Sequence, residues 1–143
     1  MMIVQVSNEN EKIWAELCAA LWPYHDAEFF IGERSGGGYK NEFLYVINNE
    51  AAAFVSLSAR HDYVEGADSS PVGYIEGIYV KPEFREHGVA RRLVEFAKAW
   101  SVENGCSELA SDCLIDNDDS RKFHNSVGFE EANVCVHFMM KLA

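Results

Sequence analysis

The spacing of apolar and polar residues predicts alternating strands and helices. A short apolar run at residues 2–6 predicts the first strand. The pattern Asn8-x-x-Glu11 is typical of a capping box at the start of a helix, and Pro23 ends that helix. Its apolar face would be formed by Ile13, Trp14, Leu17, Cys18 and Leu21. The chain therefore begins with a strand followed by an amphipathic helix.

The rest of the chain continues this alternation. Residues 24–39 predict an irregular helical arm, broken at Gly36-Gly37-Gly38. Asn48-Asn49 tolerates the positive φ angles of a tight hairpin, and residues 61–70 form a polar insert. We predict strands at 43–47, 51–60, 72–80, 107–113 and 134–142, and helices at 89–102 and 118–127. This mixture of elements indicates an α/β (α+β) fold.

Length and composition predict one domain spanning residues 1–143, because 48% hydrophobic residues suffice for one core. There is no run of about eighteen apolar residues and no signal-peptide pattern at the N-terminus, so we expect a soluble, cytoplasmic protein with no membrane partner. The cysteines are far apart and lack metal-type spacing with histidine. We predict no metal, and buried free thiols at Cys18, Cys106, Cys113 and Cys135.

The chain is strongly acidic, with a formal net charge of −11 from 23 Asp and Glu residues against 12 Lys and Arg residues. Such a field attracts polycations and repels nucleic acid, so we expect no nucleic-acid partner. Solubility alone is an equally good explanation of the charge.

Residues 74–92 run an apolar strand into a glycine-bearing loop that opens a helix. A helix N-terminus leaves backbone N–H groups unpaired and attracts phosphate groups. Gly88 permits close approach of the backbone, Ala90 keeps the loop small, and Arg85 adds a cation. The loop lacks the G-x-G-x-x-G and G-x-x-x-x-G-K-S/T patterns, which argues against NAD or ATP. The alternative is that Gly88 only eases an ordinary turn.

Three segments resemble the Gcn5-related N-acetyltransferases, the GNAT family. Arg85-x-x-Gly88-x-Ala90 resembles the family's pyrophosphate loop, and Glu76-Gly77-Ile78-Tyr79-Val80-x-Pro82 resembles the strand before it. The ending H-N-S-V-G-F at residues 124–129 resembles the family's Y-E-K-L-G-F block. The resemblance implies acetyl-CoA as cosubstrate. It also implies a GNAT fold, with a mixed, mostly antiparallel sheet that is flanked by helices and splayed between its fourth and fifth strands.

The resemblance also assigns the residues that would bind acetyl-CoA. Backbone N–H groups of the loop would hold the pyrophosphate, and one N–H of the preceding strand would polarise the thioester carbonyl. Asn117 would contact the pantetheine arm, although a helix cap is the alternative for this residue. The complete predicted set is Ile78, Tyr79, Val80, Arg85, Glu86, His87, Gly88, Val89, Ala90, Arg91 and Asn117.

Glu76 and Asp112 each interrupt an apolar strand, where a carboxylate is costly unless it faces a ligand or a charge. We assign Glu76 the role of base, through water, and Asp112 the role of orienting the acceptor ammonium, although the two roles are exchangeable. His124 stands where the family has a tyrosine that protonates the CoA thiolate. A purely structural His124 is an equal alternative, since a thiolate can leave unassisted.

A closer resemblance covers most of the chain. The block S-P-V-G-x-x-E-G-I-Y-V at residues 70–80 and His124-x-Ser126-x-Gly128-Phe129 are similar to aminoglycoside 6′-N-acetyltransferases, which are bacterial antibiotic-resistance enzymes. The resemblance implies a small polycationic acceptor in a pocket lined by Trp22, His25, Tyr63, Glu76 and Asp112. Acidic residues expected on this acceptor side are Glu28, Asp62, Glu65, Asp68, Asp116, Asp118 and Asp119.

Two other functions stay open at this point. One is a GNAT enzyme that acetylates polyamines, amino acids or protein amines; the other is a non-catalytic module that binds acetyl-CoA. The paired acids Glu76 and Asp112 argue against the second, because simple binding does not need them. The resemblance further implies a homodimer, in which the apolar final strand pairs at a sheet edge or exchanges between protomers. The resemblance to the aminoglycoside 6′-N-acetyltransferases also implies another acidic residue near the position where this chain has Asn133.

Overall fold

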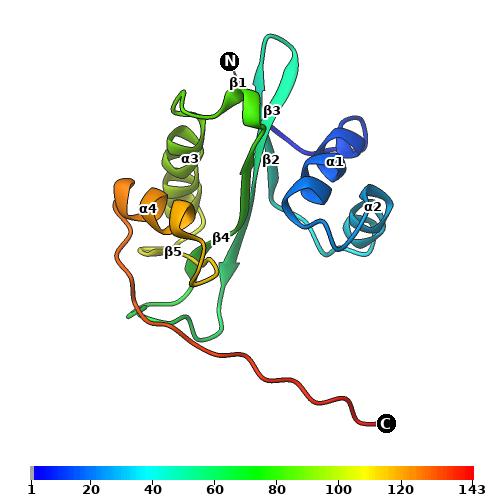
Figure 1. The fold of residues 1–143 in the computed structure, drawn as a ribbon. Helices are drawn as coiled ribbons and strands as arrows, with labels where there is room; N and C mark the ends of the chain where they lie inside the picture. The colour runs from blue at the N-terminus through cyan, green and yellow to red at the C-terminus, as the bar shows by residue number, and fades with distance from the viewer. Residues whose placement is uncertain (1) are drawn as a thin grey trace.

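The computed structural model describes residues 2–143 and shows one sheet between two pairs of helices. Helices α1 and α2 cover one face of the sheet, and α3 and α4 lie on the other (Figure 1). The strands are β1 (Met2–Gln5), β2 (Glu42–Ile47), β3 (Glu50–Arg60), β4 (Val72–Val80) and β5 (Leu109–Ser111). The helices are α1 (Glu11–Leu21), α2 (Ala27–Ser35), the 3₁₀ turn η1 (Pro82–Phe84), α3 (Val89–Glu103) and α4 (Asp118–Ser126).

The sheet order is β1-β2-β3-β4-β5, with antiparallel pairs up to β4 and a parallel pair between β4 and β5. The parallel pair ends at Ile75 and Ser111. Strand β4 continues to Val80 without β5 beside it, so the two strands part. This confirms the predicted mixed, mostly antiparallel sheet that is splayed between its fourth and fifth strands.

Each face of the sheet has its own apolar core, because side chains along a strand alternate between the faces. On β2, Phe43 and Tyr45 pack in the cluster that includes α3, whereas Leu44 packs in the cluster that includes α1. Trp14 and Cys18 of α1 are fully buried in the second cluster. Large side chains buried in this way each contribute about 1.5–3 kcal/mol. The sheet is thereby held rigid beneath the point where β4 and β5 part.

The start of α1 corrects one prediction. Asn10, not Asn8, precedes the helix, and its Oδ1 accepts a hydrogen bond from the Ser7 N–H at 2.7 Å. Asn8 instead accepts a hydrogen bond from Arg34 of α2 at 3.1 Å, so it is not free to cap α1. Ile13 is 45% exposed rather than part of the core, because no element covers that side of α1.

The end of the chain corrects a second prediction. No strand forms at Val134–Leu142: residues 130–143 are exposed and belong to no helix or strand of the described chain. This segment runs away from the body of the molecule (Figure 1). Two of the four free thiols, Cys113 and Cys135, are exposed rather than buried, because no layer covers these segments. Over residues 2–143, the structure contains no helix whose length and apolar character would allow it to cross a membrane.

Candidate active site

Glu76 lies on a bulge of β4. The register of β3 and β4 passes from Ser56 opposite Gly77 to Leu57 opposite Ile75, so Glu76 is the extra residue. A bulge bends its strand and redirects the side chain at that place. The carboxylate of Glu76 accepts a hydrogen bond from the hydroxyl of Ser58, with 2.5 Å between the oxygens. The predicted base is thus positioned by a local irregularity of the strand.

Arg60, the last residue of β3, forms a two-point ion pair with Glu76. Its Nε lies 2.8 Å from Oε2 and its Nη2 lies 2.5 Å from Oε1. The guanidinium also stacks on Tyr74, with Cζ 3.4 Å from the ring centroid. The hydrogen bonds to Glu76 raise the pKa of Arg60 above its usual value. No sequence pattern pointed to Arg60, because its pairing with Glu76 depends on the bulge.

Tyr74 connects this ion pair to the second predicted acid. The Tyr74 hydroxyl lies 2.5 Å from Oδ2 of Asp112, the first residue after β5. Burial raises the pKa of Tyr74, and the hydrogen bond to Asp112 adds to the increase. The hydroxyl therefore stays protonated and donates. The structure thus links Glu76 and Asp112 through Arg60 and Tyr74.

Beyond Ile75, one edge of β4 has no neighbouring strand. The N–H of Lys81, just after β4, donates to the carbonyl of Ala52 in β3. Successive N–H groups along a strand point alternately to its two edges. The N–H of Tyr79 therefore faces β3, whereas those of Ile78 and Val80 face the gap left by β5. Two of the three predicted donors are directed to where a thioester carbonyl would lie.

The loop before α3 has the geometry of an anion site. Glu86 (φ 65°) and Gly88 (φ 80°) are both left-handed, and Gly88 is the N-cap residue of α3. Within residues 2–143, the six N–H groups from Glu86 to Arg91 donate to no oxygen. Consecutive N–H groups in such a turn form a concave donor surface that suits a diphosphate. The residues present fit the pyrophosphate of acetyl-CoA.

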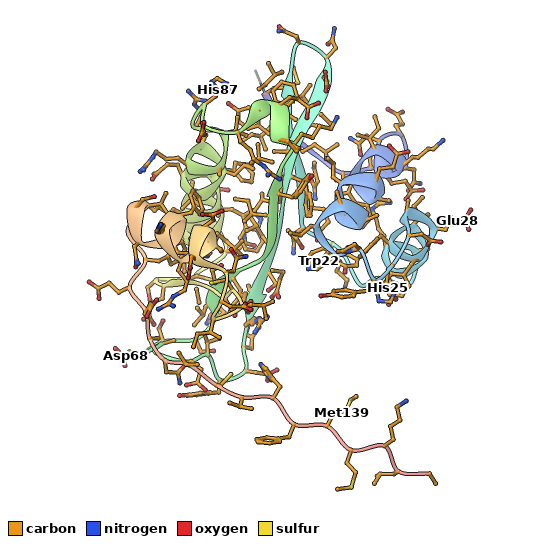
Figure 2. The ribbon with its side chains drawn as sticks, viewed as in Figure 1. Trp22, His25, Glu28, Asp68, His87 and Met139 are labelled. Carbon is orange, nitrogen blue, oxygen red and sulfur yellow. The ribbon has the colours of Figure 1, made fainter. Side chains whose placement is uncertain are left out.

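The arginine side chains at this loop are bound to backbone oxygens. Arg85 Nε donates to Val80 C=O at 2.8 Å, and Arg91 donates to Ser126 C=O at 3.3 Å. Figure 2 shows His87 at the outer end of the loop. The anion site is therefore formed mainly by backbone groups, with the guanidinium groups fixing the loop.

Asn117 and His124 both belong to α4. Asn117 Oδ1 accepts from Ser120 N–H at 3.1 Å, so the structure displays the helix-cap role. His124 Nδ1 lies 2.7 Å from Ser120 C=O, which can only accept, so Nδ1 donates. In the neutral ring, Nε2 then accepts from the Ser111 hydroxyl at 2.8 Å. His124 thus contacts the end of β5, beside the gap.

The predicted acceptor-binding residues are not all together. Trp22 lies directly against Gly77 of β4, where an added Cβ would be 2.5 Å from the indole ring. His25 stacks on Phe29, with ring centroids 3.7 Å apart, and lies with Trp22 on the α1–α2 side (Figure 2). Tyr63 is 78% exposed in the insert. Trp22 therefore lies next to the bulge, whereas His25 and Tyr63 make no hydrogen bond to Glu76 or Asp112 in the described chain.

The insert forms an open hollow of about 400 Å³. Its lining is His61, Asp62, Tyr63, Val64, Ala67, Asp68, Ser69 and Ser70. Asn133 of the C-terminal segment donates to Glu65 at 2.7 Å, which ties that segment to the insert. Over residues 2–143, no group of three or more His, Cys, Asp or Glu side chains could hold a metal ion.

Comparison with known proteins agrees with this geometry. Residues 6–129 match the model of the acetyltransferase (GNAT) family. An aminoglycoside N(6')-acetyltransferase type 1 of Salmonella enteritidis is 38% identical over 141 residues, covering 96% of this chain and 97% of the relative. One from Acinetobacter haemolyticus is 36% identical over 144 residues and covers 99% of each chain.

Solved structures extend the likeness to three dimensions. The structure of AAC(6')-Iy in complex with the bisubstrate analog CoA-S-monomethyl-acetylneamine superposes with a TM-score of 0.91 at 34% identity, covering 99% of this chain and 98% of that one. The apo structure of the 6'-N-acetyltransferase AAC(6')-IG from Acinetobacter haemolyticus gives 0.91 at 36% identity, covering all of both chains. The family match spans the bulged strand, the anion loop and α4, and the chain belongs to the acetyltransferase (GNAT) family of acetyl-CoA-dependent N-acetyltransferases.

Proposed function

We propose that this protein transfers the acetyl group of acetyl-CoA to the 6′-amine of aminoglycosides. The observation that carries the proposal is the linked pair of acids, Glu76 and Asp112, beside a gap lined by open backbone N–H groups. The relatives named above support the choice of acceptor, because they match along nearly the whole chain. The same likeness supports a single domain of 143 residues.

The donor is bound by the backbone. The N–H groups of residues 86–91 hold the diphosphate, and acetyl-CoA supplies an activated thioester. N–H groups of Ile78 and Val80 bind the carbonyl oxygen and stabilise the negative charge that develops there during attack. The arrangement costs no reorganisation during the reaction, because β3 holds the other edge of β4.

The acceptor is bound and deprotonated by side chains. Its ammonium pairs with Asp112 and Glu76, and Glu76 takes a proton, through water, to leave a neutral amine. The amine nitrogen then bonds to the thioester carbon, the C–S bond breaks, and the CoA thiolate leaves, while the nitrogen releases its excess proton to water to give the neutral amide. Trp22, next to the bulge, offers an aromatic face to the acceptor, and His25 and Tyr63 contact only sugar rings that extend from the two acids toward α2 or the insert.

His124 acts on the leaving group through Ser111. Protonated at both nitrogens, the imidazole donates Nε2–H to Ser111 Oγ, and the hydroxyl proton of Ser111 turns toward the gap. The contact of Nδ1 with Ser120 C=O fixes the ring in this orientation. Substitution of Ser111 and substitution of His124 should therefore lower the rate by similar factors.

We also infer a cytoplasmic homodimer that exchanges its C-terminal segments. Residues 130–143 leave the body of the molecule with large apolar side chains exposed, and Phe138 is 92% exposed. The neighbouring edge strand β5 has only three residues and one paired side. An unpaired edge and an unpaired apolar segment satisfy each other across two protomers.

Turnover against a small amine panel tests the function. Aminoglycosides with a free 6′-amine should release CoA thiol, and analogues with a 6′-hydroxyl should not, because a hydroxyl is the poorer nucleophile and offers no ammonium to the acids. Mass spectrometry of a kanamycin-type product locates the acetyl group. Turnover of a polyamine or peptide with none of any 6′-amino drug would reject the proposal in favour of another GNAT acceptor.

A further inference from the structure

Every oxygen of the Glu76 carboxylate is engaged. Arg60 Nη2 binds Oε1, and both Arg60 Nε and the Ser58 hydroxyl bind Oε2. The pairing is two-point, which is the form in which guanidinium binds carboxylate best. In this state, Arg60 and Ser58 occupy three of the about four acceptor positions of the carboxylate, so little of the proposed base is open to an ammonium or to a water molecule.

Arg60 also occupies the place of a bound cation. Its guanidinium lies over the face of Tyr74, and the hydroxyl of Tyr74 is bound to Asp112. A positive charge paired with Glu76, stacked on an aromatic ring and attracted by a second acid is what the acceptor ammonium would be in this site. An arginine is always charged, so this cation does not leave by losing its proton.

We propose that Arg60 is an internal competitor of the acceptor ammonium. Arg60 stays paired with the carboxylate of Glu76 until an acceptor ammonium displaces the guanidinium. The inference rests on the proposed role of Glu76 as base. The ion pair is partly exposed, with side-chain exposures of 39% for Arg60 and 31% for Glu76, so water screens it. Displacement therefore weakens acceptor binding only modestly, by about two- to tenfold. Arg60 is a positioning residue.

The Arg60–Glu76 pair has a second consequence, for acetyl-CoA that is bound without an acceptor. A free Glu76 could take a proton from water, and the water oxygen would bond to the thioester carbon, giving acetate and CoA. The Arg60 pair leaves Glu76 few open acceptor positions for such a water molecule when no acceptor is present. Arg60 thus restricts the reaction to the moment when an amine is bound.

Arg60→Met tests the inference, because methionine keeps an apolar stem over Tyr74 while the charge is removed. We expect the KM of the acceptor to fall about two- to tenfold and calorimetric acceptor affinity to rise by the same factor. The KM of acetyl-CoA should stay unchanged, and CoA release without acceptor should increase. A higher acceptor KM, or no change in either acceptor KM or acceptor-free CoA release, would overturn the inference.

Arg34→Met is the matched control. Arg34 makes a comparable ion pair with Glu11 at 2.7 Å, on the α1–α2 side, and the proposed mechanism does not use it. This variant should leave acceptor KM and acceptor-free CoA release as in the wild type. If Arg60→Met fails to fold, Arg60→Lys is measured instead, and its single-point pairing should shift both readings in the same directions by a smaller factor.

The measurements distinguish a failure of the proposed aminoglycoside acetylation from a failure of the proposed role of Arg60. If the wild type acetylates 6′-amino drugs and Arg60→Met behaves like the wild type, only the role of Arg60 is rejected. If the wild type turns over no aminoglycoside, the acceptor is wrong, and acceptor-free CoA release still decides the role of Arg60.

Discussion

The hydroxyl of Tyr74 donates a hydrogen bond to Asp112 across the point where β4 and β5 part, with 2.5 Å between the oxygens. Asp112 follows the last residue of the three-residue strand β5, so its own strand fixes it poorly. Tyr74 belongs to the nine-residue strand β4 and is buried. The carboxylate of Asp112 therefore takes its position from β4, the same strand that carries Glu76.

Asp112→Asn should raise the KM of the acceptor about tenfold with a smaller effect on kcat, because the amide still accepts from Tyr74 but has no charge for the ammonium. Tyr74→Phe is the comparison variant, since it keeps the charge of Asp112 and removes its anchor. We expect a smaller rise in KM for Tyr74→Phe. Steady-state kinetics with acceptor varied at saturating acetyl-CoA measure both; equal KM values for Asp112→Asn and the wild type would contradict the assigned role.

Glu76→Gln should lower kcat about ten- to a thousandfold, which is the usual range for losing a general base. The amide keeps the shape of the side chain and can still contact Ser58. Glu95→Gln is the control, because Glu95 is exposed on α3 and pairs only with Lys98 at 2.8 Å. Rapid measurement of CoA thiol release gives kcat, and full activity of the Glu76 variant would end its claim as base.

Gly88→Val should weaken acetyl-CoA binding severely. Gly88 has a φ of 80°, where a β-branched residue is strained, and its neighbours are only the mobile tip of Arg92. The loop would have to change its backbone and would lose the row of free N–H groups. Gly105→Val carries the same strain, with a φ of 81° and open space, at the far end of α3. Calorimetry should show lost affinity for Gly88→Val alone; equal losses would mean that general instability is the cause.

Local signals made the body of the fold predictable. Strand β4 was predicted at its observed bounds, because a proline stands on each side of an apolar run. The hairpin at Asn48 and Asn49 was also predicted, and both residues have positive φ angles, of 49° and 66°. The pairing of Arg60 with Glu76 was not predictable, since one extra residue in β4 decides which way Glu76 points.

The C-terminal segment, in contrast, was predicted as a strand and does not form one. Its alternating apolar residues predict a strand, but a strand exists only when another strand pairs with it. The described chain offers residues 134–142 no partner, so the segment is extended without being a strand. The sequence pattern therefore identified an alternating apolar segment, but the strand that it predicted does not form in the described chain.

Glu42→Gln should change how stability depends on pH. Glu42 is only 3% exposed, and burial raises the pKa of its carboxyl from 4.5 to about 7. Below pH 4.5 the group is neutral in both states; from there to about pH 7 only the unfolded chain loses the proton, so stability falls as pH rises. The full effect is about 3 kcal/mol. Urea unfolding at pH 4 and pH 8 should show the variant gaining on the wild type at the higher pH; a constant difference would refute this.

Phe138→Asp should convert the protein from dimer to monomer. In an extended segment, Val134, Val136, Phe138 and Met140 lie on one face, and each is at least 64% exposed in the single chain. In the proposed dimer a second protomer covers that face, and a charge at its centre would oppose burial. Light scattering at micromolar concentration should give twice the 16.1 kDa chain mass for the wild type and the single mass for the variant.

Tyr24→Asp is the control for this experiment, because Tyr24 is 83% exposed between α1 and α2, far along the chain from the C-terminal segment. It introduces the same charge at an aromatic position and should leave the mass of the wild type unchanged. A dimer that survives Phe138→Asp would mean that the contact lies elsewhere on the surface. A wild-type mass of one chain would reject the exchange, because the exposed apolar face would then be stable in water without a partner.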